Sequence, residues 1–171
     1  PLSLCLSVSS SLSLPPMNPN DYITLPEPKL SAADQFYLPQ VLVGLGTGIG
    51  GGSVVDGKLH RGANGFAAEF GHMIVSAGGI ECPCGQRGCW ERYASGTGLA
   101  HHAQAAAIDG QLGAILAEAG SVAAIRGEDV TDAALAGDPE AIEVIRTFAG
   151  WVAVGLVSLT NIFDPAAIVL S

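Results

Sequence analysis

The residues with the clearest chemical potential are three closely spaced cysteines and a histidine that precedes them: His72, Cys82, Cys84 and Cys89. Thiolate sulfur and imidazole nitrogen suit tetrahedral Zn²⁺, and four protein ligands leave no open coordination position, so such a zinc is structural. The pattern favours zinc, with a disulfide or unlinked buried thiols as the alternatives. The fourth cysteine, Cys5, lies far from these three in the sequence. Nothing else indicates that the protein is secreted, which is where disulfides are common.

A glycine-rich segment, Gly46–Gly52, is the second candidate. Five of its seven residues are glycine, which allows close approach of a ligand to the backbone and lets successive N–H groups point at a phosphate. Thr47 adds a hydroxyl donor. No lysine follows as in a Walker A loop, and the spacing does not fit the dinucleotide-binding fingerprint. A tight turn without a ligand is the alternative.

Two acidic residues flank the cysteine pattern. Glu69 precedes His72 by three positions and Glu91 follows Cys89 by two, so a bound metal would hold both carboxylates on one rigid loop. Carboxylates and imidazoles suit the hydroxyl groups of a sugar, to which they form charge-assisted hydrogen bonds. Solvated surface acids are the alternative, because most glutamates are exposed.

The glycine segment lies between two predicted strands. Residues 41–45 are apolar and partly β-branched, which predicts a buried strand, and residues 53–55 predict the returning strand. Asp56-Gly57 then predicts a type I′ hairpin turn, because both central positions of that turn need positive φ.

Helices are predicted further along the chain. Residues 92–107 and 112–119 are alanine-rich, and Asp138-Pro139-Glu140 combines an N-cap, a first-turn proline and a first-turn acid. The helix that begins there has one apolar face with members three or four positions apart. Its members are Ala141, Ile145, Phe148, Val152, Leu156, Leu159 and Phe163.

Asp164-Pro165 ends this helix, and residues 167–170 predict a strand. Strands and helices in this order indicate an α/β domain with a partly parallel sheet. The preceding residues 1–38 are biased towards Ser, Leu and Pro and show no apolar periodicity, so we assign them to a low-complexity or non-homologous segment and the domain to residues 39–171. A chain that begins without Met and stops on a strand is expected to be a fragment.

Charge and hydropathy exclude several classes of function. The 171 residues carry a net charge of −9, which argues against binding to nucleic acid or an anionic membrane, since both need clustered Lys and Arg. The apolar run from Phe148 to Leu159 is short of the roughly 20 residues that span a bilayer, and we expect a buried core helix. No basic residue precedes Lys29, so we expect no signal peptide and a cytoplasmic protein.

These motifs, in this order and spacing, resemble the ROK family, and within it the bacterial glucokinases. The resemblance covers about residues 41–171. It is carried by Gly46–Gly52, Asp56-Gly57-Lys58-Leu59, Arg61-Gly62-Ala63-Asn64-Gly65, Glu69-Phe70-Gly71-His72, Cys82-x-Cys84-Gly85-x2-Gly88-Cys89-x-Glu91 and Tyr93-Ala94-Ser95-Gly96.

The resemblance implies an actin-like ATPase (ribonuclease H-like) domain, present in part and with a zinc-binding loop. It implies phosphoryl transfer from ATP, with Mg²⁺, to the 6-hydroxyl of a hexose, favours glucose, and suggests a dimer or tetramer. It makes Glu69, His72 and Glu91 contacts of the sugar, and His72 with the three cysteines the zinc ligands. The residues it places at the nucleotide phosphates are Gly46, Thr47, Gly48, Ile49, Gly50 and Gly51.

Other parts of the family pattern are not found in this sequence. An Asp-x-Gly-Gly-Thr loop is absent, as is an Asn-Asp-Ala-Asn segment that supplies the general base. Asn20-Asp21 lies at a suitable distance before Gly46 but is followed by Tyr22-Ile23 rather than small residues, so Asp21 is only a weak candidate for the base. We therefore expect little or no kinase activity from the chain alone. A repressor of the same family, which senses a sugar and binds DNA, is the alternative.

Overall fold

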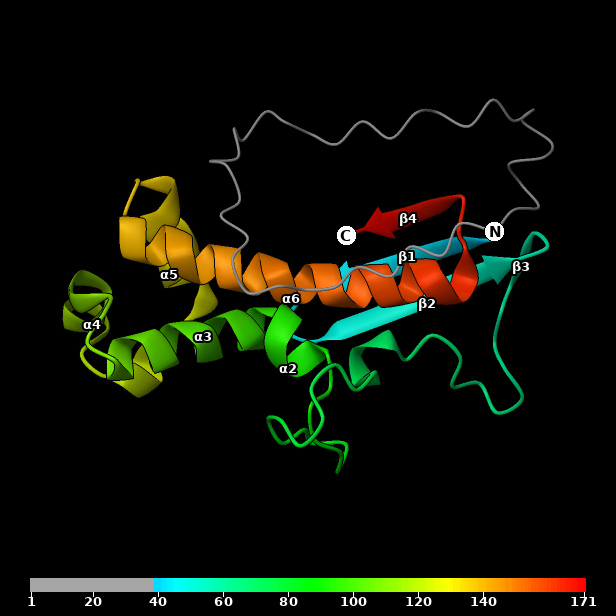
Figure 1. Cartoon of the computed structure of the whole chain (residues 1–171), viewed down its shortest axis with the longest axis horizontal. Helices are drawn as coiled ribbons and strands as arrows, with labels where there is room; N and C mark the ends of the chain where they lie inside the picture. Colours follow the sequence, from blue (N-terminus) through cyan, green and yellow to red (C-terminus); the bar gives the residue numbers. More distant parts are fainter. Residues whose placement is uncertain (1–38) are drawn as a thin grey trace, which may run out of the picture.

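The computed structural model describes residues 39–171, so Cys5 and the weak candidate base Asp21 lie outside the described residues. A small mixed sheet and a group of helices share one long helix (Figure 1). The strands are β1 (Gln40–Leu45), β2 (Ile49–Val55), β3 (Lys58–Leu59) and β4 (Ala167–Leu170). The helices are α2 (Glu91–Ala94), α3 (Gly96–Ile108), α4 (Gly113–Ala119), α5 (Gly127–Leu135) and α6 (Pro139–Phe163), with short 3-10 turns η1 (Phe70–His72) and η2 (Val122–Ala124).

The sheet has the order β3-β2-β1-β4, in which β1 and β2 are antiparallel and β1 and β4 are parallel. The predicted partly parallel sheet is thus confirmed. The hairpin turn is confirmed as well, with φ of 51° at Asp56 and 69° at Gly57.

The glycine segment is more extended than the sequence suggested. The return strand begins at Ile49 rather than at residue 53, and its glycines pair across the hairpin with residues 42–44. Gly51 is required there, because a side chain at this position would overlap the ring of Phe70 and lie 2.9 Å from the Leu42 carbonyl. Only residues 46–48 remain as the loop between the strands.

Helix α6 begins and ends as predicted. The Asp138 carboxylate accepts hydrogen bonds of 2.9 Å from the Glu140 and Ala141 N–H groups, and Asp164 ends the helix in the left-handed conformation with φ of 41°. The C-terminal half of α6 packs on the sheet, where Leu159 is fully buried with Val41 and Val43. The N-terminal half packs against α3 and α5 (Figure 1).

The expectation of a buried core helix is correct for only one side of α6. Val154, Val157 and Ile162 on its other side are exposed. Only 17% of the most apolar 18-residue stretch of the helix is buried. By length and composition α6 is the one helix of the described part that could cross a membrane. Its packing on the sheet and on α3 accounts for the apolar face predicted from the sequence, but not for Val154, Val157 and Ile162.

The alanine-rich helices form a second core around α3, α4, α5 and the start of α6. The predicted helix over 92–107 is interrupted at Ser95, whose hydroxyl caps α3 by accepting from the Gly98 N–H at 3.1 Å. Helix α5 was not predicted: it has nine residues, three of them acidic (Glu128, Asp129 and Asp132), and Val130 is its only fully buried residue.

Leu159→Ala should destabilise the fold much more than Val157→Ala. Leu159 is fully buried between the helix and the sheet, whereas Val157 is 59% exposed on the same helix. Truncation of a buried leucine costs about 2–5 kcal/mol, and an exposed change costs about 0.5 kcal/mol or less. Urea unfolding of both variants measures this, and equal losses would contradict the packing of α6 on β1.

Candidate functional site

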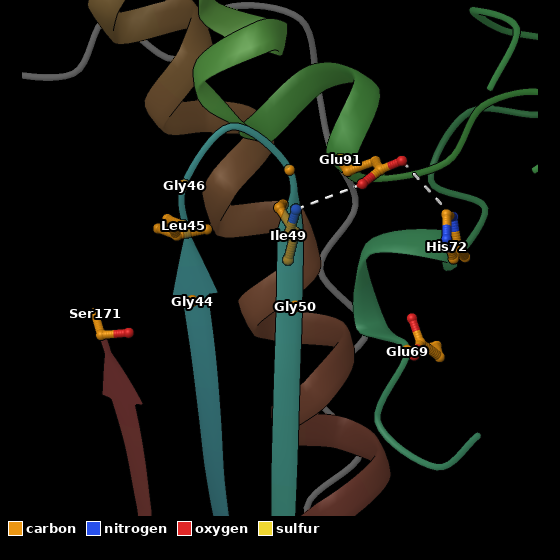
Figure 2. A pocket seen from close by; sticks show the side chains of 10 residues that line it. Gly44, Leu45, Gly46, Ile49, Gly50, Glu69, His72, Glu91 and Ser171 are labelled. Atoms are coloured by element: carbon orange, nitrogen blue, oxygen red, sulfur yellow. Dashed lines mark hydrogen bonds and ion pairs between the residues drawn. The ribbon is translucent and has the colours of Figure 1, made fainter. Parts of the chain in front are cut away.

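A cleft of about 630 Å³ opens at the carboxyl end of β1, beside the end of β4 (Figure 2). In sheets with parallel strands, ligands bind outside the carboxyl ends of those strands. The lining combines the β1–β2 hairpin with acidic and imidazole side chains from the opposite wall. The lining residues are Gly44, Leu45, Gly46, Gly48, Ile49, Gly50, Glu69, His72, Glu91 and Ser171.

The hairpin loop is fixed by the start of α3. The Gly46 carbonyl accepts from the Gly96 N–H at 2.8 Å, and the Thr47 carbonyl accepts from the Thr97 hydroxyl at 2.8 Å. Within the described residues, the N–H groups of Thr47 and Gly48 have no partner. A short loop with its carbonyls tied back and free N–H groups is suited to an anion.

The structure changes which residues of the glycine segment can meet a ligand. Of the six predicted phosphate-binding positions, Gly46, Gly48, Ile49 and Gly50 line the cleft, whereas Thr47 and Gly51 do not. The Cα–Cβ direction of Gly51 points at the Phe70 ring instead.

All three predicted sugar-contacting residues line the same cleft. Glu69 directly precedes the turn η1, His72 is its last residue, and Glu91 is the first residue of α2 (Figure 2). Glu69 makes no capping hydrogen bond, and its side chain is exposed. Glu69 and His72 thus lie across an open space from the hairpin, and the Glu91 carboxylate lies beside the hairpin itself.

The carboxylate of Glu91 joins the loop to the cysteines. Its Oε2 accepts from the Ile49 N–H at 3.5 Å, and a Cβ at Gly48 would lie 2.9 Å from the same oxygen. Its Oε1 lies 3.3 Å from Cys82 Sγ and 3.8 Å from His72 Nδ1. A glycine at position 48 therefore provides the space that Glu91 occupies. The backbone itself does not require glycine there, because the φ of Gly48 is not positive.

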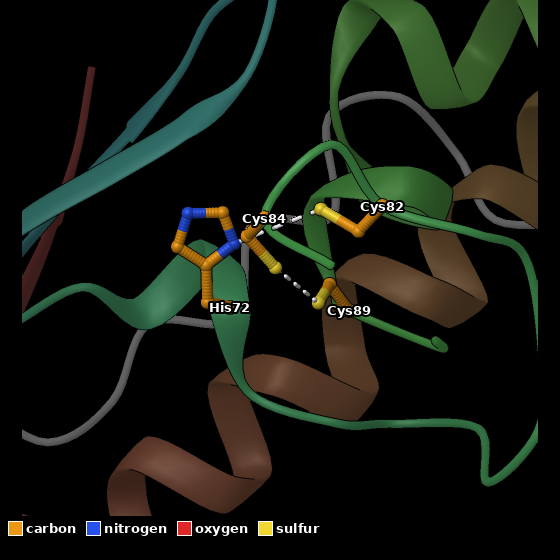
Figure 3. Close-up of side chains that lie close together, drawn as sticks. All are labelled: His72, Cys82, Cys84 and Cys89. Carbon is orange, nitrogen blue, oxygen red and sulfur yellow. Dashed lines mark hydrogen bonds between the residues drawn. The ribbon is translucent and has the colours of Figure 1, made fainter. Parts of the chain in front are cut away.

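The four predicted metal ligands converge (Figure 3). The ligand atoms of His72, Cys82, Cys84 and Cys89 all lie within 4.8 Å of one another. Cys84 Sγ is 3.6 Å from Cys89 Sγ, and Cys82 Sγ is 3.8 Å from His72 Nδ1. A tetrahedral zinc with bonds of about 2.0–2.3 Å places its ligand atoms about 3.5–3.8 Å apart, so the donor set and its spacing fit the ion.

The thiols differ in their environment. Burial raises the pKa of Cys89 to about 12 and also raises the pKa of Cys82, whereas the backbone hydrogen bond from Gln86 lowers the pKa of the exposed Cys84. A metal must displace the protons of the buried thiols, so its affinity should rise with pH. The 3.6 Å between Cys84 and Cys89 Sγ is well beyond a disulfide bond of about 2.05 Å.

Sequence reasoning missed the residues that hold this site in place. Trp90 is completely buried between Cys89 and Glu91, and Thr97 ties the loop to α3. Tyr93 and Ser95 were noted only as part of a motif. Trp90 could have been identified from the sequence as an apolar residue directly between two polar site residues, Cys89 and Glu91.

Comparison with known proteins gives a consistent result. The model of the ROK family matches residues 23–171. The glucokinase of Streptomyces coelicolor is 41% identical over 133 residues, which are 76% of this chain and 42% of that protein. The xylose repressor of Bacillus spizizenii is 32% identical over 130 residues, 76% of this chain and 30% of the repressor.

Among solved structures, a ROK family glucokinase from Streptomyces griseus in complex with glucose and AMPPNP is similar with a TM-score of 0.71 and 41% identity. The match covers 80% of this chain and 45% of that one, so the chain spans less than half the length of these relatives. The likeness confirms the predicted fold class, an actin-like ATPase domain of mixed α/β structure.

Thr97→Val should loosen the hairpin loop without unfolding the domain. The substitution keeps the shape of the side chain but removes the 2.8 Å hydrogen bond from the hydroxyl to the Thr47 carbonyl, which leaves only the 3.4 Å bond from the Thr97 N–H. Loss of about 1 kcal/mol should speed hydrogen exchange of the Gly46 and Gly96 amides about five-fold. Thr131→Val is the control, since the Thr131 hydroxyl bonds only the Gly127 carbonyl within α5. Equal exchange in both variants would show that Thr97 does not restrain the loop.

Proposed function

Because this chain belongs to the ROK family, we propose that it forms the phosphate- and sugar-binding part of a kinase that transfers a phosphoryl group from ATP to a hexose. One observation supports this most: a single cleft brings together the hairpin loop, where the Gly48 N–H has no partner within the described residues, and the side chains of Glu69, His72 and Glu91. The loop suits phosphate oxygens, and the three side chains suit sugar hydroxyls.

The proposed substrate is glucose, with its 6-hydroxyl as the acceptor. The support is the 41% identity to two proteins that are glucokinases. In the transfer, the hydroxyl oxygen bonds to the γ-phosphorus, the bond to the β,γ-bridging oxygen breaks, ADP leaves, and a base takes the hydroxyl proton. Asp21 stays the weak candidate for that base. The described residues bind and orient the two substrates, which is the main work of an enzyme in phosphoryl transfer.

We further propose that His72, Cys82, Cys84 and Cys89 hold one zinc ion. When bound, the zinc would supply a structural cross-link between η1 and the cysteine loop (residues 82–89). The four protein ligands would leave no open coordination position. Nδ1 of His72 faces Cys82, which leaves Nε2 for a ligand in the cleft. Glu91 lies two positions after the last cysteine, so its carboxylate is placed by the same loop.

A sugar-sensing domain of a ROK repressor is the second candidate, because the xylose repressor is also a relative. Both candidates bind a sugar, but only the kinase uses ATP. The test is a coupled assay for ADP release by the protein that contains this chain, with ATP, Mg²⁺ and a panel of hexoses. Turnover with glucose supports the kinase. Sugar binding without ADP release, together with specific DNA binding, supports the repressor.

Cys84→Ser should release the metal. The serine hydroxyl is a poor zinc ligand, and the remaining three donors leave a fourth position to water. We expect about one zinc per chain in the natural protein and well below one in the variant, measured by metal analysis after dialysis. Cys5→Ser is the control and should retain the metal. Full zinc content in Cys84→Ser would remove Cys84 from the ligand set.

Gly48→Ala should weaken hexose binding while the fold stays intact. Its Cβ would lie 2.9 Å from Glu91 Oε2, and the flexible carboxylate can move away at little cost in stability. Loss of one charge-assisted hydrogen bond to the sugar, about 1.5–3 kcal/mol, would weaken affinity about 10-fold or more, as measured by calorimetry. Gly52→Ala is the control, since its Cβ would meet only Leu59 Cδ1 at 4.0 Å. Weakened ATP binding with unchanged hexose binding would assign Gly48 to the phosphates alone.

A further inference from the structure

Trp90 links the polar site to the long helix α6. It stands between Cys89 and Glu91, and the side chains of Trp90 and Cys89 are both completely buried. The indole Nε1–H donates to the Trp151 carbonyl of α6 at 2.7 Å. The segment that supplies a thiol and a carboxylate to the site is therefore attached to α6 through this ring.

Gly155 of α6 provides the space for that ring. A Cβ built on Gly155 would overlap three atoms of the Trp90 indole, whereas a Cβ on Gly150 in the same helix meets nothing within 4 Å. The φ of Gly155 is not positive, so its backbone does not require glycine. Glycine inside a helix costs about 1 kcal/mol relative to alanine, and the close approach of Trp90 explains why position 155 has no side chain.

The indole cannot easily retreat from a larger residue at this position. The backbone on either side of the ring is fixed, because the Trp90 N–H donates to the Met73 carbonyl at 2.8 Å and the Trp90 carbonyl accepts from Ala94 at 2.9 Å. Tyr93 adds a second contact with α6, its ring centroid 4.4 Å from that of Trp151. A shift of the ring must therefore move the backbone of residues 89–91.

We propose that Gly155 is a positioning residue for the site: the notch that it leaves in α6 sets the place of the Cys89 thiol and the Glu91 carboxylate through Trp90. The inference rests on the proposed zinc site and sugar-binding role of Glu91. To relieve the overlap with a Cβ at position 155, the Trp90 ring must shift by a distance on the order of 1 Å. Metal ligands tolerate only about 0.2 Å, and a misplacement of about 1 Å can cost about 100-fold in an active site.

The test compares Gly155→Ala with Gly150→Ala in the full chain. Zinc affinity is measured by competition with a chelator, hexose affinity by calorimetry, and folding by far-UV circular dichroism and urea unfolding. We expect Gly155→Ala to weaken zinc binding at least ten-fold and hexose binding several-fold. Gly150→Ala should stay within two-fold for both. Unchanged zinc and hexose affinities in a folded Gly155→Ala variant would overturn the proposal.

Introducing Gly155→Ala into a Trp90→Leu variant separates an effect on positioning from a general loss of stability. Trp90→Leu removes the indole atoms that a Cβ at position 155 would meet, so adding Gly155→Ala to it should change zinc affinity less than two-fold. An equal weakening in both backgrounds would overturn the proposal. If Gly155→Ala alone does not fold, recovery of folding in the double variant supports the notch, and failure to recover contradicts it.

The same measurements distinguish this inference from the proposed function. If the natural chain binds no zinc, the proposed metal site is overturned. The hexose affinities of Gly155→Ala and Gly150→Ala then test the notch through its effect on Glu91 alone. A natural chain that binds neither zinc nor a hexose overturns both the site and the inference. Zinc affinity that depends on Gly155, in a protein that contains this chain but releases no ADP in the coupled assay, upholds the notch and contradicts only the kinase.

Discussion

The packing of Trp90 against α6 is the contact on which the site depends. The helix crosses both cores of the domain, since its first half packs with α3 and α5 and its second half covers the sheet. Trp90 attaches α2 and the cysteine loop to that helix, and Ser95 starts α3 directly after α2. The hairpin loop is in turn bound to α3 through Gly96 and Thr97. The two walls of the cleft are thus held against one helix.

The sequence was most informative where a local rule applies. The caps of α6 follow from Asp138 and Asp164, the hairpin turn follows from Asp56-Gly57, and the spacing of the three cysteines indicates a metal site. Each of these depends on residues close together in the chain. Their conformations follow from N-cap chemistry, positive φ or ligand type.

The sequence was less informative where long-range packing decides. The glycines after Ile49 form a strand because they pair with β1, and Gly51 has no side chain because the Phe70 ring, nineteen positions later, occupies that space. The glycine at position 155 likewise depends on the Trp90 indole, which comes from a segment distant in the sequence. None of these partners can be identified from periodicity, because each pair becomes adjacent only in the folded chain.

The charge of the cleft limits how a nucleotide could bind. Within the described residues, the lining has two carboxylates and no lysine or arginine, and the whole chain has a net charge of −9. Under the proposed function, the negative phosphates must approach Glu69 and Glu91 without a cationic side chain to offset the repulsion. Backbone N–H groups of the hairpin loop and the accompanying Mg²⁺ must therefore supply the positive potential. This explains physically why the loop needs close backbone approach: its dipoles act only over short distances, and side chains at Gly46, Gly48 and Gly50 would keep the phosphates away from them.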